Sequence, residues 1–331
     1  MRGGVLVLAL GIGAAHAEPL SAVDWKNRTY NNGDQSIKLV DGEWEQTHED
    51  GDYTETLSLM ATVFGDLDGD GKAEAIVHTQ YSGGGTGHFD SLDVYQESPA
   101  GPKKVGTLPG GDRGDGGIAD VRLDGRTVVL VRNGSLLSDG ACCPTLEITE
   151  QWRWVGGGLQ IDPDGLRVKS VATAEAPYEA LRKQGLAALK DQPQDAAALL
   201  CSALSTKQGD PTALQELGLA LMRNKDALAI PVLVHAVAVS SEATQAATLY
   251  NLGRAYLNAD DAAGAVEALQ RSLSLRPNNQ PTLVALEEAR AKLKATGKPA
   301  GPTVPVNAPP VDAPPVNAPA PTKVPSSGGQ P

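Results

Sequence analysis

The segment Leu249-Tyr250-Asn251-Leu252-Gly253-Arg254-Ala255-Tyr256 decides how the C-terminal half of the chain folds. Its bulky apolar residues recur at helical spacing, and Gly253 leaves room for a second helix to come close. That second helix is predicted downstream and ends before Pro277, which cannot continue a helix. Its apolar and small residues on one face are Ala265, Leu269 and Ser272. The segment therefore predicts a pair of antiparallel helices.

Similar offsets occur twice more toward the N-terminus. The nearer copy consists of Leu214, Leu217, Gly218, Leu221, Ile230, Val234 and Val237. A degenerate copy consists of Leu181, Gly185, Ala188, Ala197 and Cys201. The glycines at positions 185, 218 and 253 are 33 and 35 residues apart, close to the period of about 34 of helical-hairpin repeats. The nearer copy lacks the closing proline and has Glu242 in its place.

These residues resemble the tetratricopeptide repeat over residues 178 to 294. The resemblance implies an α-solenoid of about three helical hairpins, with a capping helix near Leu283–Leu293. An unrelated bundle of helical hairpins is the alternative.

In the tetratricopeptide family, the first helix of each hairpin lines a concave surface that holds a peptide or a partner's helix. By this resemblance the partner-binding residues are Arg182, Gln215, Met222, Tyr250, Arg254 and Asn258. Leu186, Leu189 and Leu219 project onto the same surface, and we expect Leu186 and Leu219 to pack between repeats.

The region before residue 172 is rich in Gly, Asp and Thr and has short alternating apolar runs, which predict strands. The predicted strands are Ser36–Val40, Glu43–Gln46, Leu57–Phe64, Ala75–Gln80, Ser91–Tyr95, Ile118–Leu123, Thr127–Val131 and Leu146–Val155. Asp41-Gly42 and Asp124-Gly125 suit two-residue hairpin turns. The pattern predicts an antiparallel all-β domain, either a barrel or a sandwich.

The most specific local motif is Gly65-Asp66-Leu67-Asp68-Gly69-Asp70-Gly71-Lys72-Ala73-Glu74. A tight loop would turn the three alternating aspartates toward one point, where Glu74 and the Lys72 carbonyl complete an oxygen cage that suits Ca²⁺. The EF-hand register fails because Val77 stands at the last ligand position. A solvated acidic turn without metal is the alternative.

This motif resembles the calcium loops of FG-GAP and integrin-type repeats, over about a dozen residues and in a single copy. The resemblance implies that the ion has a structural role. Because the motif is not repeated, it does not predict a propeller.

The first residues predict export. Arg2 precedes the apolar run Val5–Ile12, and Ala15-His16-Ala17 fits a signal-peptidase site, so the mature chain is expected to begin near Glu18. No cysteine follows Ala17 to take a lipid anchor. We therefore expect a periplasmic or secreted protein without a membrane span.

Composition disfavours some partners. The 331 residues carry a formal net charge of −12, which repels phosphate backbones and disfavours nucleic-acid binding. The segment from 296 to 331 repeats Val-Asn/Asp-Ala-Pro and is expected to be disordered, either as a spacer or as a ligand for a Pro-binding partner.

No motif for catalysis is present, so we expect a protein that is not an enzyme. Adjacent Cys142 and Cys143 allow a strained disulfide, whereas Cys201 fits an apolar helix face. A hydrolase that uses the Asp66–Glu74 motif would need open coordination at the metal.

The predicted organisation is a signal peptide (1–17), a β-domain with the calcium loop (18–171), a linker (172–177), a helical array (178–295) and the tail. The functional hypothesis is an exported adaptor: the helical array binds a protein partner and calcium shapes the β-domain. The alternative is a calcium-dependent adhesin or glycan binder, in which the helices serve as a stalk.

Overall fold

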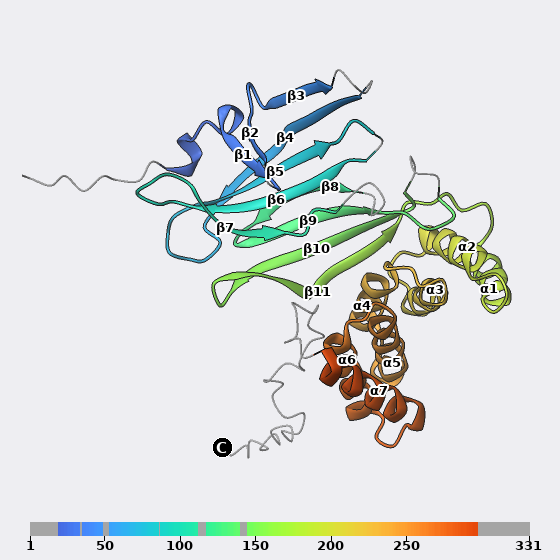
Figure 1. The fold of residues 1–331 in the computed structure, drawn as a ribbon. Coiled ribbons are helices and arrows are strands. Elements are labelled where there is room, and N and C mark those ends of the chain that lie inside the picture. The colour runs from blue at the N-terminus through green and yellow to red at the C-terminus, as the bar shows by residue number, and fades with distance from the viewer. Residues whose placement is uncertain are drawn as a thin grey trace, which may run out of the picture.

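The computed structural model describes residues 19–33, 35–48, 53–85, 87–111, 117–139 and 144–296. The predicted signal peptide, the Cys142-Cys143 pair and the tail after residue 296 lie outside these residues. Within them, antiparallel β-sheets precede helices packed in pairs (Figure 1).

A five-stranded sheet forms the first half of the β region. Its strands are β3 (Glu43–His48), β4 (Tyr53–Gly65), β5 (Glu74–Ser82), β6 (Phe89–Gln96) and β7 (Lys103–Leu108). They lie in sequence order, and every neighbouring pair is antiparallel.

A four-stranded sheet follows, with the order β11-β10-β9-β8. Its strands are β8 (Ile118–Asp124), β9 (Thr127–Gly134), β10 (Leu146–Val155) and β11 (Gly158–Ser170). Alternating residues of both sheets, such as Ile76 and Leu92 from the first and Leu130 and Ile148 from the second, fill one hydrophobic core.

A short ribbon covers the opposite face of the five-stranded sheet. It consists of the 3₁₀ turns η1 (Leu20–Ala22) and η2 (Trp25–Asn27) and the hairpin of β1 (Thr29–Asn32) with β2 (Gln35–Lys38). Trp25, Tyr30 and Ile37 pack there with Val77 and Tyr95 in a second, smaller core.

The prediction that Asp41-Gly42 joins two paired strands is wrong. The turn forms, with φ of 55° at Asp41 and 93° at Gly42, but only Val40 and Glu43 form a bridge across it. β2 pairs with β1, and β3 pairs with β4 in another sheet. The predicted hairpin at Asp124-Gly125 is confirmed as β8 and β9.

Seven helices follow among the described residues. They are α1 (Tyr178–Ala188), α2 (Pro193–Thr206), α3 (Pro211–Arg223), α4 (Ala229–Val239), α5 (Glu242–Asn258), α6 (Ala262–Leu275) and α7 (Gln280–Thr296). Each glycine predicted to permit close packing faces a leucine of the next helix. A Cβ at Gly185, Gly218 or Gly253 would lie 2.8, 2.5 and 2.5 Å from Leu200, Leu233 and Leu269 respectively.

The helices dock on β11, the edge strand of the four-stranded sheet. His235 Nδ1 of α4 accepts the Val168 N–H at 3.0 Å, and the Gln208 amide pairs with both the N–H and the carbonyl of Ser170. Buried Cys201 of α2 lies 3.2 Å from the Ser170 hydroxyl. Helix side chains thus satisfy backbone groups that an edge strand would otherwise leave open.

None of the helices that the structure describes is both long and apolar enough to cross a membrane.

Candidate functional site

The acidic loop between β4 and β5 turns sharply at two glycines. Gly69 and Gly71 have φ values of 86° and 85°, which side chains rarely adopt. The loop's own N–H groups orient the carboxylates: Gly69 donates to Asp66 Oδ1 at 2.6 Å, and Asp70 donates to Asp68 Oδ1 at 3.0 Å. The sequence thus encodes both the turn and the direction of its carboxylates.

Three of the five predicted metal ligands converge. One carboxylate oxygen each from Asp66, Asp68 and Glu74 lies within 4.8 Å of the others. The Asp70 carboxylate is not in this group and instead accepts the Lys72 N–H at 2.8 Å. The converging carboxylates could hold a metal ion.

Glu74 is the best evidence that this group suits a cation. It is 2% exposed, and its oxygens accept the Leu67 N–H at 2.7 Å and the Gln96 amide at 3.2 Å. Gln96 also donates to Asp68 Oδ2 at 2.9 Å. Two neutral donors orient the carboxylates without neutralising them, and a buried charge without a counterion is costly.

Arg126, in the turn between β8 and β9, contacts the loop. It lies over Gly69, where a Cβ would clash with its guanidinium, and donates to the Leu67 carbonyl at 3.4 Å. No ion pair between Arg126 and a carboxylate occurs in the described part of the chain. The guanidinium therefore positions the loop and leaves the three carboxylates available to a metal.

The predicted partner-binding residues lie on the first helices of the pairs. Arg182 forms an ion pair with Glu216 at 2.6 Å, and Arg254 forms one with Glu288 at 2.9 Å. Asn258 Nδ2 donates to the Met222 carbonyl at 3.2 Å. These contacts connect successive helix pairs, so the two arginines already have acidic partners within the chain.

Gln215, Met222 and Tyr250 are half-buried, and Met222 and Tyr250 pack against the main core. Of the leucines expected between repeats, Leu219 packs against that core, whereas Leu186 is 41% exposed. Leu189 is buried. The surface that the first helices leave open is thus partly apolar and bordered by ion pairs.

Sequence reasoning missed a buried polar cluster between the sheets. Asp90 accepts hydrogen bonds from His78 Nε2 at 2.7 Å, from Gln80 Nε2 at 3.1 Å and from the Ile118 N–H at 3.2 Å. Burial raises the pKa of Asp90, but the hydrogen bonds from His78 and Gln80 outweigh it and lower the pKa below its usual value. The bond to Ile118 connects the two sheets. A local motif does not reveal the cluster because its members come from three strands.

Comparison with known proteins adds no identification: no protein-family model matches the chain, and no curated protein matches its sequence.

Proposed function

We propose that this protein is an exported adaptor whose tetratricopeptide-like helices bind a peptide or protein partner, while a calcium ion holds the acidic loop of the β region in shape. The signal-peptide pattern predicted in residues 1–17 supports the location, and the arrangement of the helices supports the binding of a partner.

The observation that carries the proposal is the way the helices dock. The polar contacts with β11 come from His235 on α4 and from Cys201 of α2 and Gln208 just after it. These belong to the second helices of their pairs. The first helices carry Gln215, Met222 and Tyr250 and do not take part in these contacts. Their outer face is therefore available to bind a peptide or protein partner.

Recurring contacts support the repeat interpretation. The pairs Arg182–Glu216 and Arg254–Glu288 both span 34 residues. Arg223 donates to the Leu189 carbonyl across 34 residues, and Lys292 donates to the Leu257 carbonyl across 35. Equivalent contacts at one period are what a stack of repeated hairpins produces, because each repeat meets only its neighbours.

The acidic loop supports calcium over other cations. All the convergent ligands are carboxylate oxygens, which hard cations prefer. Magnesium demands near-octahedral geometry and retains several waters, whereas calcium accepts the irregular shell of a loop.

Photo-crosslinking in the full-length exported chain tests the adaptor proposal. A photoreactive residue replaces Tyr250 on α5 or, as a control, Gln270 on α6, which is exposed on a second helix. We expect a discrete adduct with one partner from position 250 and none from position 270. Equal adduct patterns from the two positions, or none from position 250, would contradict partner binding by the first helices.

A calcium-dependent glycan binder is the competing function. It places recognition in the β region and makes it depend on the ion, so its adducts would come from β-region positions and disappear with chelation.

A further inference from the structure

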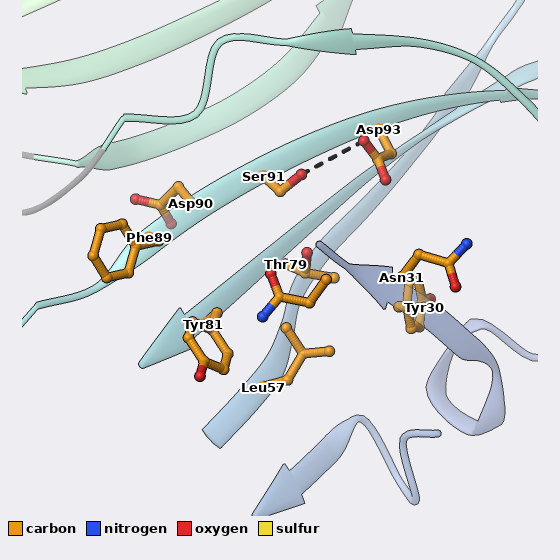
Figure 2. Close-up of a pocket in the computed structure, with 10 residues that line it drawn as sticks. Tyr30, Asn31, Leu57, Thr79, Tyr81, Phe89, Asp90, Ser91 and Asp93 are labelled. Carbon is orange, nitrogen blue, oxygen red and sulfur yellow. Dashed lines mark hydrogen bonds between the residues drawn. The ribbon is translucent and has the colours of Figure 1, made fainter. Parts of the chain in front are cut away.

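A small cavity lies on the face of the five-stranded sheet that the β1–β2 ribbon covers. It has a volume of about 170 Å³ and lies between Asn31 and Asn32 on β1 and side chains of β4, β5 and β6. Figure 2 shows Tyr81, Phe89 and Thr79 from the sheet on one side and Asn31 on the other. Neither the acidic loop nor the helices contribute to it.

The apolar part of this cavity includes the rings of Tyr81 and Phe89, beside Leu57 and Tyr30. Tyr81 and Phe89 are directly opposite each other on β5 and β6, so their side chains lie on the same face at about 5 Å spacing between Cβ atoms. Phe89 is 49% exposed. The exposed Phe89 ring beside Tyr81 offers an aromatic surface on which a ligand can pack.

Polar groups surround this aromatic surface. Thr79 is 8% exposed, and its hydroxyl forms no hydrogen bond with the residues that the structure describes. Ser36 donates to Asn31 Oδ1 at 3.0 Å, which orients that amide. The cavity therefore offers a hydroxyl and amides to a ligand with hydroxyl groups.

The charged groups around the cavity limit the class of ligand that it can bind. Two aspartates line the cavity, Asp90 and Asp93. The Asp90 carboxylate accepts hydrogen bonds from His78, Gln80 and the Ile118 N–H. The Asp93 carboxylate is held by Lys104 Nζ at 2.7 Å and by the Thr107 hydroxyl at 2.9 Å. A cationic ligand would have to compete with Lys104, and an anionic ligand would be repelled by Asp93. A neutral polar ligand meets neither obstacle.

We propose that this cavity binds a neutral saccharide ring. A pyranose has an apolar C–H face that stacks on aromatic rings, and hydroxyls at its rim that exchange hydrogen bonds with amides and hydroxyls. Tyr81 and Phe89 supply the aromatic surface, and Thr79, Asn31 and Asn32 supply the rim. The binding site goes beyond the proposed adaptor function and does not depend on it.

The cavity is separate from the metal ligands. Glu74 begins β5, and the residues of that strand that line the cavity, Thr79 and Tyr81, lie five and seven residues further along it. These spacings correspond to roughly 16 and 23 Å. A sugar in the cavity cannot coordinate an ion held by Glu74, and its binding needs no cation as a ligand bridge.

Calorimetric titration of the full-length exported chain tests the proposal. The probes are cellotetraose, maltotetraose and the tetramer of N-acetylglucosamine, each up to millimolar concentration. We expect at least one probe to bind saturably, and Phe89→Ala to weaken it about tenfold through loss of stacking. Thr79→Val, which keeps the side-chain shape, should also weaken it.

Phe64→Ala is the matched control because Phe64 is likewise an exposed phenylalanine of the same sheet, at 37% exposure, but does not line the cavity. It should leave the affinity unchanged, as should chelation of divalent cations. The proposal fails if no probe binds, if Phe64→Ala weakens binding as much as Phe89→Ala, or if chelation abolishes binding. The crosslink from position 250 should persist in Phe89→Ala, which separates this result from the adaptor test.

Discussion

At the scale of single residues, the burial of Glu74 favours a metal site over a solvated acidic turn. It is buried among carboxylates and receives only neutral donors. We expect calcium to raise the thermal stability of the native chain and Glu74→Gln to abolish that increase. At a calcium concentration of 100 times Kd, the stabilisation amounts to about 2.7 kcal/mol. Thermal unfolding with calcium and with chelator measures it.

Asp70→Asn is the control because Asp70 lies outside the converging carboxylates. It should retain most of the calcium effect. In chelator, Glu74→Gln should be close to the native chain in stability. It removes like-charge repulsion and its amide oxygen still accepts the Leu67 N–H, but its NH2 group cannot accept from Gln96. Equal calcium responses in Glu74→Gln and the native chain would rule out this site.

His235 gives a second prediction at this scale. Burial, together with the charge of Arg167, lowers its pKa to about 4, and the neutral ring accepts the Val168 N–H. The folded pKa is below the unfolded value of about 6.5, so the unfolded chain takes up the proton first. The free energy of unfolding should therefore fall as pH falls from about 6.5 to about 4, by about 3 kcal/mol.

His235→Asn removes this titration and keeps an acceptor for Val168. Denaturant unfolding from pH 7 to pH 4 should show a smaller loss of stability in the variant than in the native chain. Parallel pH profiles would show that His235 is not buried as a neutral acceptor.

The glycines that pack the helix pairs carry the prediction at the scale of elements. An alanine usually stabilises a helix by about 1 kcal/mol relative to glycine, but a Cβ at Gly218 would lie 2.5 Å from Leu233. Overpacking costs about 1–3 kcal/mol, which exceeds the gain in helix propensity. Gly218→Ala should therefore lower the free energy of unfolding. Gly106→Ala, whose Cβ meets nothing within 4 Å, should change the free energy of unfolding by less than about 0.5 kcal/mol. Stabilisation by Gly218→Ala would mean that the paired helices are not so close.

Local sequence patterns predicted some helices and strands correctly but did not predict which strands pair with each other. Glycine spacing predicted the helix pairs because each pair is formed by residues near in sequence. The Asp41-Gly42 turn also formed, yet the strands on either side of it pair elsewhere. β2 pairs with β1 and places Ile37 in the second core, and β3 pairs with the long strand β4. A turn preference fixes the local bend only.

The same limit explains what the sequence showed of the sites. Asp66, Asp68 and Glu74 were predicted because their loop is continuous. Gln96 and Arg126, which orient that loop, come from β6 and from the turn between β8 and β9. At the scale of the whole molecule, docking of α4 on β11 depends on His235 and Val168, which are 67 residues apart. Nothing in either local segment indicates that contact.

For the whole molecule, the central proposal is that the two regions have separate roles. The first helices bind the partner, and the ion only stabilises the shape of the β region. The most direct test compares the crosslink yield from position 250 in calcium and in excess chelator, on the same full-length chain. Separate roles predict crosslink yields in calcium and in chelator that agree within about twofold, because α5 is separate from the acidic loop and the loop contributes nothing to the outer face of α5. Loss of the adduct on chelation, with adducts instead from β-region positions only in calcium, would contradict it.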